Sequence, residues 1–397
     1  MDSLLTQFAI GYTFSVMFDV QPFPHIRVQG EPSERGFSYG RLAADRIRIG
    51  EEIYREAMQL HGHDWTEVKR LAHDFARSIE AVDPRCLQEV TAIAEGAGVD
   101  RETIIVINAR SELFNGVAPD AAARGREAMP AEGCTSALAY GTATREGRLL
   151  HGQNWDFNAR CVESSIILEI QPEDGPSLIT FVEAGGLARS GFNDAGIAVT
   201  ANNLECEQDF GNQGVPLSII RRRILLASNF AQALGAVTSV PRAVSNNMTL
   251  SSVHGDIAIS LETTPKDVFF VHPESDGIFA HANHFLSAEG LSKITDGARF
   301  GRTPCSFYRD KRVLRHLRAR SGDLTLEDFK TAFTDDFGSP FAVCRPPTRS
   351  GSGHLVSTVA SVIFDPLLGE LHARPAPYDP STTYKTYKLG TEATQAA

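Results

Sequence analysis

A cysteine that follows a glycine, where a flexible stretch meets a predicted strand, is the residue of this sequence best placed for chemistry. Residues 117–132 are rich in Ala, Gly, Pro and charged side chains, a composition typical of a linker, and an apolar run begins at Thr135. The Cys134 thiol can attack the carbonyl of Gly133, which carries no obstructing side chain, to form a thioester that water then hydrolyses. The pattern predicts that the chain cuts itself between Gly133 and Cys134.

Cleavage would give Cys134 a free α-amino group. An α-amine has an ordinary pKa of about 7.7–8.0, close to the working pH of a general base. One residue would then supply both the nucleophile and the base. In the uncut chain the same nitrogen is an amide and cannot accept a proton, so we expect the uncut chain to be inactive toward other molecules.

Polar residues further along the chain can complete such a site. Asn154 and Asp156 flank Trp155 at the end of a predicted strand, where polar groups are costly unless they have partners. Asn283 follows another predicted strand, and an asparagine amide can donate to a developing oxyanion. Arg345, after a short predicted strand, can orient Asp156 or hold a substrate carboxylate.

Other kinds of site remain open. Cys134 could instead pair with a histidine, and the candidates are His151, His281, His284 and His354. His281 and His284 could bind a metal ion, but residues three apart in a strand face opposite ways and no third ligand is evident. A chain that never cuts itself could act as a binding module.

Two further groups of residues are expected to be structural. The basic run Arg221–Arg223 is predicted to be the solvated face of a helix, with contact to coenzyme A phosphates as the alternative. The cysteines other than Cys134 are expected to be buried, inert thiols: Cys86, Cys161, Cys206, Cys305 and Cys344.

The predicted elements divide at the linker. Helices are predicted over 32–62, 65–82, 84–96, 216–227, 230–238, 305–320 and 326–333, and the segment 102–114 fits a helix or a buried strand. Strands are predicted over 14–20, 135–143, 149–154, 165–171, 178–182, 187–192, 197–202, 247–253, 257–262, 268–272, 278–282, 359–364 and 370–374. Long runs of strands with helices segregated between them indicate an α+β protein of antiparallel sheets covered by helices.

Composition excludes several classes of protein. The 397 residues carry a formal net charge of −11, which argues against nucleic acid as a partner. The longest uncharged stretches are too polar for a membrane span, and no positively charged leader precedes the apolar N-terminal run. We therefore expect a cytoplasmic protein without a nucleic-acid or membrane partner and without a bound metal.

The ordered motifs resemble those of the acyl-coenzyme A:6-aminopenicillanic acid acyltransferase (isopenicillin N acyltransferase) family of N-terminal nucleophile hydrolases. Upstream, the similar segments are Arg35-Gly36-Phe37-Ser38-Tyr39-Gly40, Ile93-Ala94-Glu95-Gly96-Ala97-Gly98 and Asn108-Ala109-Arg110-Ser111-Glu112. Downstream, they are Gly133-Cys134-Thr135, Gly152-Gln153-Asn154-Trp155-Asp156, 193–200, His281-Ala282-Asn283-His284 and Ala360-Ser361-Val362-Ile363. Each segment alone is a moderate signal, whereas the ordered set is a strong one.

The resemblance implies a four-layer αββα sandwich and a role for each candidate residue. It implies that Cys134 is the nucleophile freed by self-cleavage, that Asp156 organises the site, that Asn283 stabilises the oxyanion and that Arg345 lies near the nucleophile. Residues 1–133 would be a helical pro-segment, cut off but retained, and residues 134–397 the nucleophile-bearing subunit of one structural domain.

The resemblance also implies a chemistry. An acyl group would pass from an amide or an acyl-coenzyme A thioester, through an acyl-cysteine, to an amine or to water, in specialised metabolism. No cofactor is expected beyond acyl-coenzyme A as a possible co-substrate. The chain lacks the peroxisomal signal with which the best-known fungal members of the family end, so the native substrate stays open.

Overall fold

The computed structural model describes residues 20–60, 62–116, 133–300, 303–349 and 355–390. The linker predicted over 117–132, nearly all of the strand predicted over 14–20, and His354 lie outside these residues. Within the described ranges, no helix combines the length and the apolar character that crossing a bilayer requires.

The upstream segment is helical, as predicted, and its helices begin and end at recognisable residues. Pro32 and Pro84 occupy the first turns of their helices, and the Asp64 carboxylate caps a third by accepting two backbone N–H bonds. Gly98, with positive φ, ends the fourth. The elements are α1 (Pro32–Leu42), α2 (Ala44–Leu60), α3 (Trp65–Val82), α4 (Pro84–Ala97), α5 (Arg101–Asn108) and α6 (Arg110–Gly116).

Two predicted segments are each divided into two helices. The helix predicted over 32–62 breaks at Ala43 into α1 and α2. Helix α1 packs backbone to backbone against α4, since a Cβ on Gly40 would overlap the carbonyl of Ile93. The ambiguous segment 102–114 is helix and not strand, and it breaks at Ala109 into α5 and α6.

The first sheet has eight strands in the order β1-β4-β5-β6-β7-β8-β9-β10. Their bounds are β1 (His25–Gly30), β4 (Ser165–Pro172), β5 (Leu178–Glu183), β6 (Ser190–Asn193), β7 (Ile197–Asn203), β8 (Asn246–Ser252), β9 (Ile257–Thr263) and β10 (Val268–Val271). The expectation of purely antiparallel sheets is wrong at one edge, where β1 runs parallel to β4. No hairpin joins these two strands; helices α1 to α6 lie between them in the chain, so a tight turn does not force opposite directions.

The second sheet has the order β11-β2-β3-β13-β14-β15, with β12 pairing β13. Its strands are β2 (Gly133–Ala139), β3 (Leu150–Asn158), β11 (Ile278–His281), β12 (Thr348–Arg349), β13 (Leu355–Asp365), β14 (Glu370–Pro375) and β15 (Lys385–Lys388). The remaining helices are α8 (Cys161–Ser164), α9 (Leu217–Leu225), α10 (Phe230–Thr238), α11 (Ala288–Lys293), α12 (Ser306–Arg318) and α13 (Leu326–Phe333). Sequence patterns did not indicate β1, β12, β15 or α11, which are short or lie at sheet edges.

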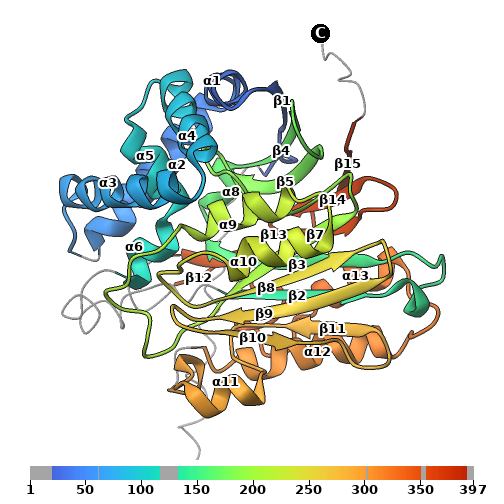
Figure 1. Cartoon of the computed structure of the whole chain (residues 1–397). Helices are drawn as coiled ribbons and strands as arrows, with labels where there is room; N and C mark the ends of the chain where they lie inside the picture. Colours follow the sequence, from blue (N-terminus) through green and yellow to red (C-terminus); the bar gives the residue numbers. More distant parts are fainter. Residues whose placement is uncertain (1–19, 61, 117–132, 301–302, 350–354, 391–397) are drawn as a thin grey trace, which may run out of the picture.

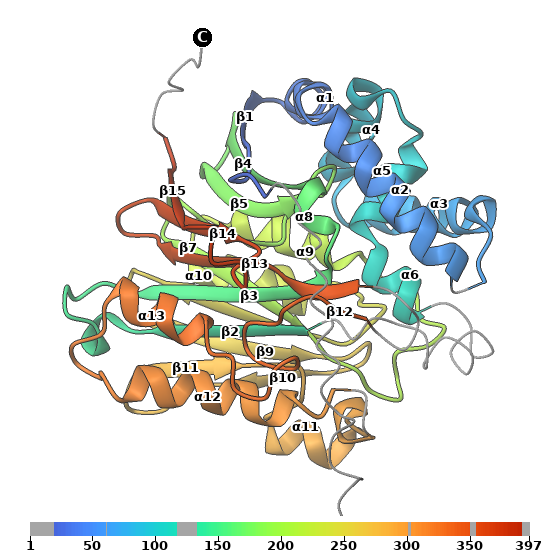
Figure 2. The same ribbon diagram turned by 180° about the vertical axis from the view of Figure 1, so that it is seen from behind.

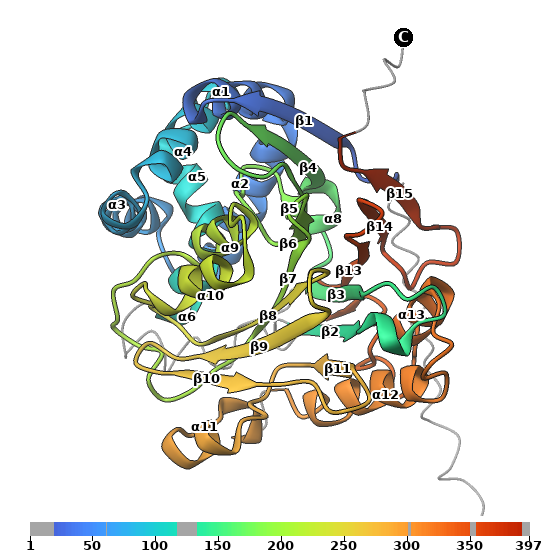
Figure 3. The ribbon, with the colours of Figure 1, turned by 45° about the vertical axis from the view of Figure 1, so that its right-hand side comes forward.

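The two sheets face each other, and helices cover their outer faces (Figures 1 and 2). Figure 3 shows α9 and α10 on the outer side of the first sheet and α12 and α13 on the outer side of the second. Between the sheets, Trp155 of β3 meets Phe181 of β5 edge to face, with ring centroids 5.7 Å apart. This arrangement confirms the predicted α+β, four-layer αββα sandwich.

The arginine run of α9 is not a solvated helix face, and that prediction is wrong. Arg222 is fully buried and Arg221 nearly so, because α9 lies between the first sheet and the upstream helices. Arg222 donates to Glu89 of α4 at 2.7 Å, and Arg35 of α1 donates to the same carboxylate at 2.6 Å. Burial opposes ionisation of Glu89, but the two guanidinium groups outweigh it and lower the pKa of that carboxyl.

Candidate active site

Gly133 and Cys134 are the first two residues of β2, which pairs with β3 in an antiparallel hairpin, as predicted. Gly133 lies opposite Asp156 and Cys134 lies opposite Trp155. Side chains alternate along a strand, so Cys134 and Trp155 share the face toward the first sheet, whereas Asp156 lies on the face toward α12 and α13. All four residues are buried.

Asp156 and Arg345 form a buried ion pair directly behind Gly133. Arg345 Nε lies 3.0 Å from Asp156 Oδ2, and the Thr358 hydroxyl donates to Asp156 Oδ1 at 2.7 Å. A Cβ on residue 133 would overlap Asp156 Oδ2 and lie 3.1 Å from Arg345 Cζ, so only glycine fits. Arg345 lies in the loop between α13 and β12, not behind a strand as predicted, and Thr358 fixes its backbone N–H at 2.7 Å.

Asn283 follows β11 and holds the backbone of the cysteine. Its Oδ1 accepts from the Cys134 N–H at 3.0 Å, and its Nδ2 donates to the Asn203 carbonyl at 2.9 Å. In the uncut chain the amide oxygen therefore faces the nitrogen that cleavage would convert to an α-amine. The second N–H of the amide is the group available for the predicted role toward an oxyanion.

Arg309 of α12 completes this arrangement, and sequence reasoning missed it. The fully buried guanidinium donates to the Cys134 carbonyl at 2.6 Å and to Asn283 Oδ1 at 2.6 Å. The signal that could have revealed it is its helical spacing, because Arg309, Val313 and Leu317 form one buried stripe of α12. A charged residue in an apolar stripe needs a buried partner.

The Cys134 thiol faces the layer between the sheets, beside a second arginine that sequence reasoning missed. Arg189 Nη2 lies 4.0 Å from Cys134 Sγ, and its guanidinium lies 3.9 Å from the centre of the Trp155 ring. Stacking on the indole fixes the guanidinium in place. Positive charge at this point can stabilise negative charge that develops during attack by the sulfur.

The candidate histidines have other partners. The ring nitrogens of His151 contact Ser251 Oγ at 2.9 Å and Thr200 Oγ1 at 2.8 Å, and burial lowers its pKa to about 3. His281 contacts Glu262 at 2.8 Å and the Ala282 carbonyl at 2.9 Å. With both ring nitrogens occupied, neither histidine is placed to take a proton from Cys134.

His284 contacts Ser306 Oγ at 2.7 Å through its Nδ1 and supports the Asn283 loop, whose backbone N–H donates to the same hydroxyl. Burial lowers the pKa of His284 to about 3. Among the described residues, no three His, Cys, Asp or Glu side chains gather in a way that could hold a metal ion.

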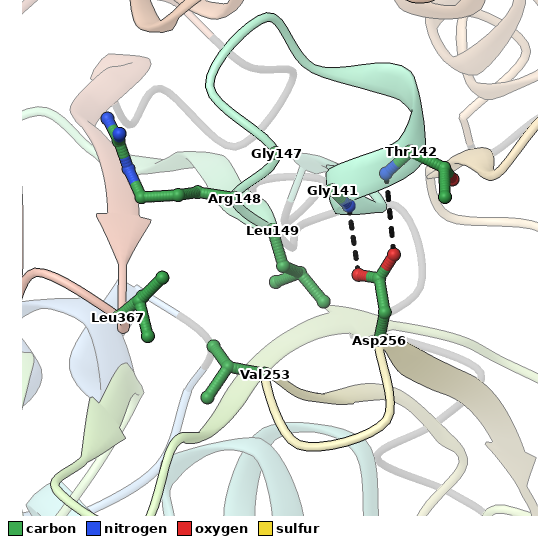
Figure 4. Close-up of a pocket in the computed structure, with 8 residues that line it drawn as sticks. All are labelled: Gly141, Thr142, Gly147, Arg148, Leu149, Val253, Asp256 and Leu367. Carbon is green, nitrogen blue, oxygen red and sulfur yellow. Dashed lines mark hydrogen bonds between the residues drawn. The ribbon is translucent and has the colours of Figure 1, made fainter.

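A separate hollow of about 310 Å³ lies at the far end of β2, around Gly141 and Asp256 (Figure 4). The Asp256 carboxylate there accepts from the backbone N–H of Gly141 at 2.9 Å, which ties two loops together. Gly141 follows Cys134 by a whole strand, so this hollow is not part of the site.

Comparisons with known proteins identify the family of the chain. The family model described as acyl-coenzyme A:6-aminopenicillanic acid acyl-transferase matches residues 142–371. The 40 kDa form of acyl-coenzyme A:6-aminopenicillanic-acid-acyltransferase from Emericella nidulans is 28% identical over 345 residues, which cover 86% of this chain and 89% of that protein.

The chain also has a partial likeness to solved structures. A mutant conjugated bile acid hydrolase from Clostridium perfringens has a TM-score of 0.46 and 14% identity, covering 65% of this chain and 93% of that one. Penicillin V acylase from Agrobacterium tumefaciens has a TM-score of 0.38 and 12% identity, covering 63% of this chain and 85% of that one. Because the family model covers more than half of the chain, the protein belongs, as its motifs predicted, to the acyl-coenzyme A:6-aminopenicillanic acid acyl-transferase family of acyl-transferring enzymes.

Proposed function

We propose that this protein is a self-processing acyltransferase or amide hydrolase whose nucleophile is Cys134, freed by cleavage after Gly133. The observation that carries the proposal is the setting of Cys134 at the start of β2. Asn283 accepts from its N–H, Arg309 holds its carbonyl, and its sulfur faces Arg189 between the sheets. Family membership supports acyl transfer and amide hydrolysis as the general chemistry.

Cleavage proceeds by an N-to-S acyl shift. The Cys134 sulfur bonds to the Gly133 carbonyl carbon, the peptide C–N bond breaks, and the nitrogen gains a proton to become the α-amine. Water then hydrolyses the thioester, which releases Gly133 as a carboxylate and Cys134 as a free thiol. Asp156, held by Arg345 and Thr358 behind Gly133, organises this step.

In the cleaved enzyme the α-amine of Cys134 takes the thiol proton as the sulfur attacks a substrate carbonyl. The Asn283 oxygen keeps the amine in place, and Arg309 in turn fixes that oxygen. The second N–H of Asn283 stabilises the oxyanion. The leaving amine or thiol takes the proton, and water or an amine resolves the acyl-cysteine.

The two polypeptides, 1–133 and 134–397, stay together as one domain. Glu89 of the upstream piece is held by Arg222 of the downstream piece, and the Asn108 side chain bonds the backbone of Gly185 and Leu187. Strand β1 is hydrogen-bonded into the first sheet along β4. The upstream piece is therefore a structural subunit and not a released peptide.

Substrates are small amides, amines or acyl-coenzyme A thioesters, the last because the Emericella relative is named for acyl-coenzyme A. The setting is specialised metabolism in the cytoplasm, which fits six free, buried cysteines. No resident cofactor takes part in these steps.

Intact-mass measurement of the purified chain tests self-processing. The wild-type protein of 43.2 kDa should yield pieces of 133 and 264 residues, roughly 14 and 29 kDa, while the C134A variant stays whole. A wild-type chain that stays uncut and is active would refute the proposal. Clean cutting of C134A would assign cleavage to an outside protease.

The pH dependence of the initial rate tests the base. Screening coenzyme A thioesters and N-acyl amines, with detection of both acid and amide products, identifies a substrate. Its rate should rise with pH as the α-amine loses its proton, near neutrality. A rate that is constant from about pH 5 to about pH 9 would contradict the role of the α-amine.

A further inference from the structure

Arg309 of α12 joins the two ends of the Cys134 backbone. Its Nη1 donates to the Cys134 carbonyl at 2.6 Å and to Thr135 Oγ1 at 2.8 Å, and its Nη2 donates to Asn283 Oδ1 at 2.6 Å. The same Asn283 oxygen accepts from the Cys134 N–H at 3.0 Å. With two donors on its oxygen the amide keeps one orientation, so the nitrogen that cleavage would convert to an α-amine faces a fixed acceptor.

The first turn of α12 also holds the backbone of Asn283. The hydroxyl of Ser306, the first residue of this helix, accepts from the Asn283 N–H at 2.7 Å. Ser306 and Arg309 are both fully buried, and they lie one helical turn apart. A single rigid turn therefore fixes Asn283 at its backbone and at its side chain, and groups fixed in this way need no rearrangement when the reaction begins.

The charge of Arg309 is not matched by a carboxylate. Within the part of the chain that the structure describes, its hydrogen bonds end on three neutral oxygens, and no ion pair involves it. The neighbouring Asp310 carboxylate lies 3.0 Å from Lys311 Nζ instead. A guanidinium stays ionised when it is buried, and burying an unpaired charge is costly, which calls for a functional explanation. Its field falls first on the groups that share its hydrogen bonds, the nitrogen and the carbonyl of Cys134.

This charge acts on the α-amine. The Cys134 nitrogen and Arg309 Nη2 contact one oxygen, at 3.0 Å and 2.6 Å. Two such nitrogens are within the range of about 4–6 Å over which one positive charge disfavours another. The guanidinium keeps its proton, so the amine is the group that responds, and its unprotonated form is favoured.

The charged groups on the other sides of Cys134 leave this effect in place. Behind Gly133, Asp156 and Arg345 pair with each other at 3.0 Å, so their charges offset each other. Between the sheets, the group 4.0 Å from Cys134 Sγ is the guanidinium of Arg189, which is positive too. Cleavage adds a carboxylate at Gly133, and Asp156 Oδ2, which already lies against that residue, repels it.

The charged groups of the Asn283 loop bond within that loop. Glu262 contacts His281 at 2.8 Å and accepts from the backbone N–H of Ser287 at 3.0 Å. His284 carries no charge at neutral pH, because burial lowers its pKa to about 3. Arg309 is therefore the charged group that reaches the Cys134 backbone from this side.

We propose that Arg309 is a positioning residue for the base: it fixes the Cys134 backbone and Asn283 in one arrangement, and its charge keeps the α-amine unprotonated and ready to take the thiol proton. The inference rests on the proposed function, because it requires Cys134 to be the freed N-terminus. The pKa of the amine then lies below the ordinary value of about 7.7–8.0, so the enzyme keeps its activity into mildly acidic solution.

Two substitutions at Arg309 separate its charge from its shape. R309Q removes the charge and keeps a donor, whereas R309K keeps a positive charge without the two-armed guanidinium. Both should lower the plateau of kcat/KM for octanoyl-coenzyme A or N-octanoylglycine, whichever is turned over. Only R309Q should raise the midpoint of the acid limb, by about 1 pH unit, the low end of the shift that one nearby charge produces. Below the midpoints, R309Q therefore loses a further factor of about 10 relative to its own plateau.

R315Q is the matched control, because Arg315 is an exposed residue of the same helix. It should keep the plateau and the midpoint of the wild type. The midpoint does not depend on how much of R309Q has cut itself, since the uncut chain is expected to be inactive. If R309Q stays whole, the two pieces are co-expressed with a starting methionine before Cys134, whose removal exposes the amine.

The outcomes separate this inference from the proposed function. A midpoint equal in R309Q and the wild type would overturn the charge effect, even with a lower plateau, because a purely structural role lowers the plateau alone. An equal rise in R315Q would overturn it as well, since any lost charge would then suffice. A wild-type rate that does not depend on pH contradicts the proposed function instead.

A chain that cuts itself but turns over neither substrate is tested by a second measurement. The pH midpoint for alkylation of Cys134 by iodoacetamide, read from the mass of its peptide, reports on the same base without a substrate. A higher midpoint in R309Q than in R309K supports the inference, and equal midpoints overturn it.

Discussion

Replacing Gly133 with alanine probes the packing behind the predicted scissile bond. The new Cβ would overlap Asp156 Oδ2, and it would lie 3.0 Å from Asp156 Cβ and 3.1 Å from Arg345 Cζ. Ordinary carbon contacts are about 3.5–4.0 Å. Neither neighbour yields easily, because both are buried and both side chains are held: the Thr358 hydroxyl donates to Asp156, and the Arg345 guanidinium donates to Cys305 Sγ.

Relief of the overlap requires the carboxylate or the Gly133 carbonyl to move by about 1 Å, and a misplacement of this size costs a catalysed step about 10²-fold in rate. We therefore expect G133A to cut itself about 100-fold more slowly than the wild type. A time course of intact mass after synthesis measures this rate directly, by the loss of the 43.2 kDa chain.

The matched control is G235A, because Gly235 in α10 has ordinary helical φ and no atom within 4 Å of an added Cβ. It should cut at the wild-type rate. Cleavage of G133A at that same rate, with a normal melting temperature, would refute the reasoning that links Asp156 and Arg345 to processing.

Three further predictions concern buried charges. The R345A variant leaves Asp156 without its ion-pair partner and should lower the free energy of unfolding by about 3–5 kcal/mol in a urea titration. The double variant R345A/D156N removes the buried charge as well and should lose less stability than R345A; an equal or greater loss in the double variant would contradict this. Arg222 and Arg35 hold the pKa of Glu89 below its usual value. The stability that the ionised Glu89 contributes should therefore be fully present above the unfolded pKa of about 4.3, and it should be lost as the pH falls through the lower folded pKa. The E89Q variant should melt at a lower temperature than the wild type at neutral pH, and its melting temperature should fall less as the pH is lowered. An acid-unfolding midpoint equal to that of the wild type would count against the ion pairs of Glu89 with Arg35 and Arg222. Burial raises the pKa of Glu112 to about 7, so the stability that this carboxyl contributes is fully present below about pH 4.3 and is lost as the pH rises through 7. The E112Q variant keeps an acceptor for the Leu217 N–H and should therefore be more stable than the wild type above about pH 7. Identical curves of melting temperature against pH for the two proteins would disprove this.

Local sequence patterns were enough to predict sheets covered by helices and part of the site, whereas the four layers came from the resemblance to a family. The Gly133-Cys134 junction stood out because a linker composition ends at a strand, and Asp156 stood out because a strand tolerates a carboxylate only beside a partner. The structure places Cys134, Asp156, Asn283 and Arg345 around one strand end, although their catalytic roles stay predictions.

What local patterns could not supply was pairing across the chain. Arg222 was predicted to lie on a solvated helix face, and Arg309 and Arg189 were not singled out, because each contacts a group far away in the sequence. The parallel edge formed by β1 was missed for a similar reason, since a six-residue strand ahead of the upstream helices gives no sign of the strand it will join. Burial of a charge is decided by tertiary packing, which periodicity does not encode.

Strand β1 has a consequence for how this protein can be made. It pairs with β4 along six residues, and β4 is buried along nearly its whole length. A chain synthesised from residue 134 onward would expose β4 as a long, apolar sheet edge, a template for aggregation. We therefore expect the upstream piece to help the downstream piece fold, so that active protein is recoverable from separate genes for the two pieces only when both are expressed in the same cell.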